Sequence, residues 1–167
     1  MNLNKMLAFL SQEDLQQLTE KILSTEDKTF QNITFRQVLP FLDESYIDAL
    51  FTKHLLEQEI FNSLLPFVSD SILETVVQSY LNKEIDCDIK SMLPFLNSNC
   101  VAKIAYQWID ENKSIHKILP FLSDQTLHEI VLDYTNGNEK YDIDELLPFL
   151  SQQDIRLVFQ YNLKKEK

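Results

Sequence analysis

The phrase Leu-Pro-Phe-Leu constrains the fold of this chain more than any other feature, because it recurs at nearly regular intervals. Six related copies begin 32, 26, 28, 26 and 28 residues apart, with alanine in place of proline in the first. The copies are Leu7–Leu10, Leu39–Leu42, Leu65–Val68, Leu93–Leu96, Leu119–Leu122 and Leu147–Leu150. A period of this length is typical of stacked supersecondary units rather than of one irregular core.

A residue that favours the start of a helix follows each copy of the phrase. Counting the leading leucine as position 0, position 4 holds Ser11, Asp43, Ser69, Asn97, Ser123 and Ser151. Short polar side chains accept hydrogen bonds from the unpaired amides of a first helical turn. We therefore expect a helix, named helix B here, to begin immediately after each of these residues.

Apolar residues follow each of these caps at helical spacing. Positions 8, 11, 12, 15 and 16 are mostly apolar or aromatic, which is the spacing of an amphipathic helix. Position 8 holds Leu15, Ile47, Leu73, Val101, Leu127 and Ile155. Position 12 holds Thr19, Phe51, Val77, Ala105, Val131 and Phe159. The spacing predicts helices of about 12 to 14 residues, and the alternation typical of strands is absent from the sequence.

A second, shorter helix, named helix A, is predicted before each phrase. Position −5 holds the cap residues Asn2, Thr34, Asp88, Ser114 and Asp142, with Ile60 as the exception. The apolar positions −4 and −1 hold Leu3, Phe35, Phe61, Ile89, Ile115 and Ile143, then Met6, Val38, Leu64, Met92, Ile118 and Leu146. Because proline removes an amide donor and crowds the preceding turn, we expect helix A to be kinked. We also expect Phe95 and Phe121 of the phrase to be largely buried.

The predicted fold is all-α, a right-handed αα-hairpin array (solenoid) of six units of 26–32 residues within one domain, residues 1–167. The repeats span approximately 2–31, 32–58, 59–86, 87–112, 113–140 and 141–167. Helices this short are marginal alone, so each pair must stack on its neighbours. Across essentially the whole chain this architecture resembles αα-solenoids such as HEAT and tetratricopeptide arrays, although the tetratricopeptide Trp-Leu-Gly pattern is missing. The resemblance implies a scaffold that binds proteins or peptides.

Charge and composition argue against some partners. Acidic residues outnumber basic ones 26 to 15, giving a net charge of −11, which opposes direct binding to nucleic acid. The apolar runs are too short for a membrane span, and the chain enters its first repeat without a leader segment. Cys87 and Cys100 fit neither a metal site nor a disulfide framework, as expected in a reducing compartment. We therefore expect a cytoplasmic protein that binds neither nucleic acid nor membrane.

No catalytic, cofactor or metal site is predicted. His54, His116 and His128 have no acid or cysteine at the spacing of a catalytic triad or a metal site. A Gly-rich phosphate loop is excluded, because Gly137 is the one glycine of the chain. The expectation is therefore a protein without enzyme activity.

Two groups of residues are candidates for binding a partner. Position 15 places a ring with a polar atom in four successive repeats, His54, Tyr80, Trp108 and Tyr134. These rings either complete the core or form an aromatic ladder that receives a peptide or helix. The second group occupies positions that are polar in early repeats and consists of Tyr106, Leu132, Leu157 and Tyr161. It forms either a wider core stripe or an apolar patch for self-association or a partner helix.

The function expected from these patterns is a non-enzymatic scaffold or adaptor for protein–protein interaction. One alternative is an acidic decoy or inhibitor that binds a basic partner surface, which requires the acidic residues to cluster on one face. Another is a small enzyme or ligand-binding protein, which requires an enclosed polar pocket.

Overall fold

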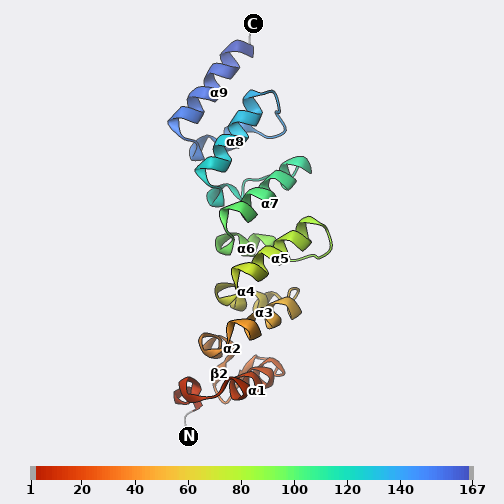
Figure 1. The fold of residues 1–167 in the computed structure, drawn as a ribbon, viewed down its shortest axis with the longest axis vertical. Helices are drawn as coiled ribbons and strands as arrows, with labels where there is room; N and C mark the ends of the chain where they lie inside the picture. The colour runs from red at the N-terminus through yellow and green to blue at the C-terminus, as the bar shows by residue number, and fades with distance from the viewer. Residues whose placement is uncertain (1–2, 166–167) are drawn as a thin grey trace. The chain divides into compact units, whose positions relative to one another are not determined.

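The computed structural model describes residues 3–165, so the predicted cap Asn2 lies outside the described residues. Within that range the chain is predominantly helical, with nine α-helices, eight 3₁₀ helices and one two-stranded hairpin (Figure 1). None of the helices in residues 3–165 is both long enough and apolar enough to cross a membrane. The coarse prediction of a helical protein is therefore confirmed.

The six predicted B helices are present. They are α1 (Gln12–Leu23), α3 (Glu44–Lys53), α5 (Asp70–Leu81), α7 (Ser98–Asp110), α8 (Asp124–Thr135) and α9 (Gln152–Lys165). Each begins at the residue after its predicted cap, so the predicted helix starts are confirmed. At five of the six caps the side chain accepts an amide hydrogen bond, as Ser123 does from Thr126 at 3.2 Å. Asp43 is the exception, since its side chain makes no such bond.

The recurring phrase forms a 3₁₀ turn in every repeat. These turns are η2 (Leu7–Phe9), η3 (Leu39–Phe41), η4 (Leu65–Phe67), η5 (Leu93–Phe95), η6 (Leu119–Phe121) and η8 (Leu147–Phe149). Where proline is present it stands in the first positions of the turn, where an amide would lack a helical partner anyway. An α-helical helix A precedes the phrase in three repeats, as α2 (Phe35–Val38), α4 (Gln58–Leu64) and α6 (Ile89–Met92). Elsewhere it is reduced to turns or to the 3₁₀ helices η1 (Leu3–Lys5) and η7 (Ile143–Glu145).

The phenylalanines of the phrase are not core residues. Phe95 and Phe121 are 38% and 37% exposed, so the expectation that they are largely buried is wrong. The leading leucine, in contrast, is buried in each of the first five repeats, as Leu119 is at 1% exposure. A 3₁₀ turn has three residues per turn, so its leucine faces inward while the proline and phenylalanine point to other sides.

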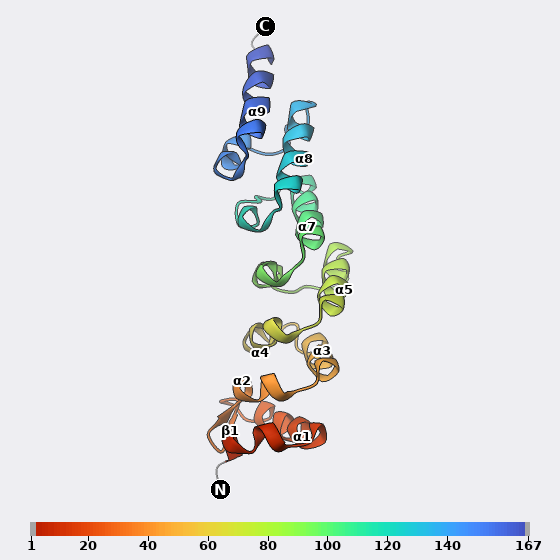
Figure 2. The same ribbon diagram turned by 60° about the vertical axis from the view of Figure 1, so that its left-hand side comes forward.

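A β-hairpin in the linker between the first two repeats was not predicted. Strands β1 (Thr29–Phe30) and β2 (Ile33–Thr34) pair antiparallel, with Phe30 opposite Ile33. The turn residues Gln31 and Asn32 both have positive φ, 49° and 63°, which suits a two-residue hairpin turn. Ile33 is fully buried, and β1 packs against α1 in the lowest part of Figures 1 and 2. The hairpin therefore closes the first repeat, which has no α-helical helix A of its own.

Three B helices end in the same left-handed motif. Lys83, Asn112 and Gly137 follow α5, α7 and α8 with φ of 61°, 54° and 95°. The next amide in each case bonds a carbonyl five residues earlier, as Lys113 bonds Trp108 at 2.7 Å. This is the Schellman arrangement that satisfies the last carbonyls of a helix.

The described residues divide into two compact units. The first comprises residues 3–76 with 85–88, and the second comprises 77–84 with 89–165. In the first unit α3 packs against α4, where the rings of Phe51 and Phe61 stack with centroids 5.0 Å apart. In the second unit α8 and α9 lie side by side (Figures 1 and 2). Each of these contacts joins one repeat to the next.

Candidate functional site

The aromatic residues predicted as a ladder are largely internal in the second unit. Trp108 Nε1 donates a hydrogen bond to the Tyr80 hydroxyl at 3.3 Å, which links position 15 of two successive repeats. Tyr134 donates in the same way to Asn162 Oδ1, also at 3.3 Å and also between two residues at position 15. Trp108 and Tyr134 are only 5% and 8% exposed. Their burial favours the interpretation in which these rings complete the core.

The fourth member of that group, His54, lies in the first unit. Helix α3 ends at Lys53, so His54 occupies the C-cap rather than a helix face. Its Nδ1 lies 2.6 Å from Glu57 Oε1. The loop that follows lines an open hollow of about 490 Å³ together with Ile85 and Asp86, and it carries the 80% exposed Leu56. His54 is thus held by its own loop and does not extend an aromatic row.

Two members of the second predicted group, Tyr106 and Tyr161, use their hydroxyls within the second unit. Tyr106 donates to Glu129 at 3.0 Å, and burial, reinforced by that carboxylate, raises the pKa of Tyr106 to about 12. Tyr161 donates to Glu139 at 3.0 Å, and its ring meets that of Tyr134 edge-on with centroids 5.4 Å apart. Both side chains are half-buried. They belong in part to the packing between successive repeats.

The two leucines of that group differ in exposure. Leu132 on α8 is 40% exposed, whereas Leu157 on α9 is half-buried. Of the four predicted residues, Leu132 is therefore the exposed one, and Tyr106, Leu157 and Tyr161 are half-buried.

An exposed apolar stripe that the sequence analysis missed lies on α9. Ile155, Phe159 and Leu163 are 40%, 61% and 54% exposed. They are four residues apart and so share one side of the helix, here called the C-terminal face. They occupy positions 8, 12 and 16, the columns predicted to be core. The equivalent residues Leu127 and Val131 of α8 are 4% and 0% exposed.

A different side of α9 packs against α8. Val158 and Asp154 are 5% and 4% exposed, and Asp154 Oδ1 lies 2.5 Å from His128 Nδ1 on α8. Ser151 donates its hydroxyl to the other carboxylate oxygen of Asp154 at 2.6 Å. Burial raises the pKa of Asp154, but the hydrogen bonds from Ser151 and His128 outweigh it, so the net pKa lies below 3.8. The hydrogen bond between His128 and Asp154 joins this side of α9 to α8, while Ile155, Phe159 and Leu163 stay exposed.

Apolar side chains are also exposed before α1. Met6 is 37% exposed and Phe9 88% exposed, while Leu3 is half-buried. We call these three residues the N-terminal face. In the other five repeats, positions −4 and −1 are all buried, as Phe61 and Leu64 are at 0% exposure. The first repeat thus exposes the helix A columns, and the last repeat exposes the helix B columns.

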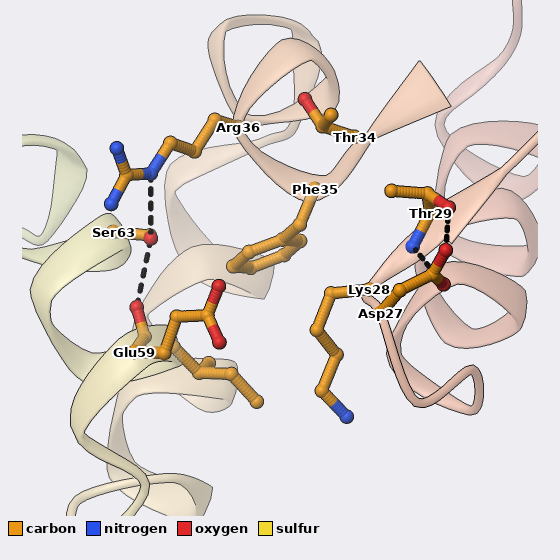
Figure 3. A pocket seen from close by; sticks show the side chains of 9 residues that line it. Asp27, Lys28, Thr29, Thr34, Phe35, Arg36, Glu59 and Ser63 are labelled. Carbon is orange, nitrogen blue, oxygen red and sulfur yellow. Dashed lines mark hydrogen bonds between the residues drawn. The ribbon is translucent and has the colours of Figure 1, made fainter. Parts of the chain in front are cut away.

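A small hollow of about 170 Å³ lies in the first unit beside the β-hairpin (Figure 3). Its polar groups are largely bonded within the protein, since Arg36 Nε donates to Ser63 Oγ at 3.2 Å and Asp27 accepts from the Thr29 hydroxyl at 2.6 Å. Lys28 Nζ donates to the Leu23 carbonyl at 2.8 Å. The hollow is smaller than the roughly 300–1,000 Å³ of typical ligand pockets. These polar side chains therefore serve the local structure.

Among residues 3–165, no three His, Cys, Asp or Glu side chains lie close enough together to hold a metal ion. Cys100 is buried. The pKa of the other cysteine thiol, Cys87, is raised to about 11 by its own burial and by the carboxylates of Asp86 and Asp88. At neutral pH this thiol is therefore protonated and a poor nucleophile. No protein-family model, curated protein or solved structure matches the chain.

Proposed function

We propose that this chain is a non-enzymatic protein-interaction module built from αα repeats, and that its C-terminal face binds a protein partner. The observation that carries the proposal is the exposure of Phe159, 61%, at a position where the other five repeats are at most 1% exposed. The residues at position 12 of the other repeats are covered by neighbouring elements. Phe159 has no such neighbour in the described chain and is exposed to water. A bound partner would supply that neighbour.

The energetics of burial support a binding role for this face. Fully burying a leucine, isoleucine or phenylalanine side chain contributes about 1.5–3 kcal/mol, and three such residues are exposed together here. An exposed apolar stripe can serve as the centre of an interface. The partner must therefore offer an apolar surface of similar length.

Charge around the face narrows the kind of partner. Arg156 lies one residue from Ile155 and Lys164 one residue from Leu163, whereas the Lys165 ammonium is already paired with Glu139. Arg156 and Lys164 stand out in a chain whose net charge is −11. Opposite charges at the rim of an interface favour association and fix its register. The partner is expected to combine apolar anchors with acidic side chains.

We also propose that the repeats stack as an αα-solenoid, as the resemblance to such arrays implies. Support comes from contacts inside each unit that join one repeat to the next, such as the Phe51–Phe61 stack and the His128–Asp154 pair. The first contact joins helix B of one repeat to helix A of the next, and the second joins the B helices of two successive repeats. An array of this kind presents its last helix without a cover unless a partner or a capping helix provides one.

The test of the binding role compares two variants of α9 that carry the same new charge. Phe159→Glu alters the C-terminal face, and Gln160→Glu alters an exposed neighbour outside it. Proteins from the native host that wild type and Gln160→Glu retain should be lost from Phe159→Glu by at least about tenfold. Leu132→Glu tests the predicted group on α8 in the same assay. If Phe159→Glu retains every partner of the wild type, the face has no binding role.

A further inference from the structure

We infer that the partner of the C-terminal face is the N-terminal face of a second molecule of this chain, so that molecules associate end to end. The inference rests on the proposed function of the C-terminal face and names its occupant. Each face contains a position that meets the neighbouring repeat elsewhere in the chain, position 12 in the C-terminal face and position −4 in the N-terminal face. Contacts between successive repeats show which position meets which.

The apolar contact comes first. Phe51, at position 12 of the second repeat, stacks on Phe61, at position −4 of the third, with an interplanar angle of 22°. Position 12 of a repeat therefore packs on position −4 of the next. In the last repeat position 12 is Phe159, and in the first repeat position −4 is Leu3. A second molecule placed as a next repeat would cover Phe159 with Leu3.

A side-chain amide repeats the same relation. Gln12, at position 5, donates from Nε2 to the Phe41 carbonyl at 2.8 Å and accepts from the Asp43 amide through Oε1 at 2.9 Å. Gln12 therefore binds the backbone at the end of the phrase and at the cap of the following repeat. Position 5 of the last repeat is also glutamine, Gln152, and it is exposed. Its counterparts in a second molecule would be the carbonyl of Phe9 and the amide of Ser11.

Charge complementarity supplies the third step. Position 9 of one repeat reaches the cap region of the next twice within the units, from Asp48 to the Ser69 amide at 2.9 Å and from His128 to Asp154 at 2.5 Å. In the last repeat position 9 is Arg156. In the first repeat the residue equivalent to Asp154 is Asp14. Arg156 of one molecule would thus meet Asp14 of the next with opposite charge.

The first repeat already holds Asp14 in the required pose. Ser11 donates its hydroxyl to Asp14 Oδ2 at 2.6 Å, as Ser151 does to Asp154 Oδ2 at the same distance. In Asp154 the other carboxylate oxygen, Oδ1, is bonded to His128. Asp14 is exposed, so its Oδ1 is accessible to a partner. Because the two faces differ, the contact is heterologous and adds molecules one after another rather than closing as a symmetric pair.

The experiment measures the mass of the untagged protein by sedimentation equilibrium over about two decades of concentration. The mass of the wild type should rise with concentration and pass that of a dimer. Phe159→Glu should stay monomeric, while Arg156→Glu and Asp14→Arg should each weaken association by at least about tenfold. The double variant Arg156→Glu with Asp14→Arg exchanges the two charges and should restore it. Gln160→Glu should associate as the wild type does.

Three results would overturn the inference, and far-ultraviolet circular dichroism ensures that each variant is folded. A wild type that is monomeric throughout removes the second molecule as partner, while the retention assay above still decides the proposed function independently. Association that stops at a dimer and is unchanged by Asp14→Arg shows α9 pairing with α9 of a second molecule. A charge-exchanged double variant no better than its single parents removes the Arg156–Asp14 contact.

Discussion

Helices α8 and α9 have nearly the same apolar pattern and opposite exposure. Leu127 and Val131 on α8 are 4% and 0% exposed, whereas Ile155 and Phe159 at the same positions on α9 are 40% and 61% exposed. At position 12 the residue on α9, Phe159, is larger than Val131 on α8 and is also apolar. The type of residue therefore does not explain the difference in exposure. Burial of a column is decided by the element that lies over it, and the described chain places none over this side of α9.

This comparison separates two roles of one pattern. In α8 the apolar columns stabilise the fold, and in α9 the same columns are available to a partner. Changes at equivalent positions should therefore have large effects on stability inside the array and small ones on the last helix.

The largest effect is expected from Phe51, which occupies the same position 12 in the second repeat as Phe159 does in the last. Phe51→Ala should lower the free energy of unfolding by about 3–5 kcal/mol, because Phe51 is fully buried and stacks on Phe61. Phe159→Ala should change it by less than about 0.5 kcal/mol, since its side chain is mostly exposed. Urea denaturation at low protein concentration measures both. Equal losses for the two variants would show that α9 is covered in solution.

The hydrogen bond between His128 on α8 and Asp154 on α9 should give the next largest effect on stability. His128→Ala should cost about 1.5–3 kcal/mol, because it removes a hydrogen bond to a buried carboxylate. The outcome distinguishes the packed side of α9 from its exposed side. A loss no larger than that of Phe159→Ala would mean that α9 does not dock on α8 through this pair.

The same pair predicts an acid dependence. The pKa of Asp154 in the folded state lies below its ordinary value of 3.8, so the unfolded state takes up this proton first as pH falls. The stability that Asp154 contributes is complete above about pH 5 and is lost as pH falls through the lowered pKa. In denaturation series between neutral and acidic pH, Asp154→Asn should lose less stability on acidification than the wild type. Parallel curves for the two proteins would rule out this role.

A smaller effect is expected at the helix caps. Ser123→Ala should cost about 1 kcal/mol, and Ser123→Asp should be tolerated, because an aspartate side chain can accept the same amide hydrogen bond as serine. Asp43→Ala should cost only about 0.3–0.5 kcal/mol, since Asp43 makes no side-chain cap bond and contributes only charge near the helix start. Thermal unfolding of the variants gives the order. A Ser123→Asp protein less stable than Ser123→Ala would contradict the interpretation of the cap.

The smallest effect again compares the two ends of the pattern. Gln12→Ala should cost about 0.5–1 kcal/mol, because Gln12 makes two hydrogen bonds to the second repeat. Gln152→Ala should leave the monomer unchanged within error and instead weaken self-association. If Gln152→Ala destabilises the isolated monomer as much as Gln12→Ala does, the equivalence of the two residues is wrong.

The helix starts could be predicted from the sequence because their causes are local. A proline-containing phrase, a short polar cap and an apolar stripe lie within about sixteen residues, and all six B helices begin where this order places them. The hairpin at Thr29–Thr34 is not predicted by the repeat pattern, because it lies in a linker outside the helical columns. Its signal was present in Asn32, which tolerates a left-handed conformation, between pairs of β-forming residues.

The candidate site could not be predicted in the same way, because exposure depends on neighbours. Ile155, Phe159 and Leu163 fit the core columns and were assigned to the core for that reason. Tyr106 and Tyr161 depart from the columns, and the sequence leaves open whether they widen the core or form a surface. In the structure their side chains bond within the second unit. The signal for both faces is present in the sequence. Apolar columns in the first and last repeats have no adjacent repeat on one side in the sequence to cover them.

The left-handed helix ends have a consequence for engineering the protein. Lys83 and Asn112 adopt a left-handed backbone conformation, which costs most residues with a side chain about 1–2 kcal/mol more than glycine and costs asparagine less. Lys83 lies 2.9 Å from Glu111, whose pKa is lowered to about 2 by hydrogen bonds from Lys113 and Lys83. Glycine at 83 would relax the turn but remove this ion pair, whereas glycine at 112 would relax its turn without removing a charge. Asn112 is therefore the site at which thermostability can be raised with the least change to the contacts between repeats.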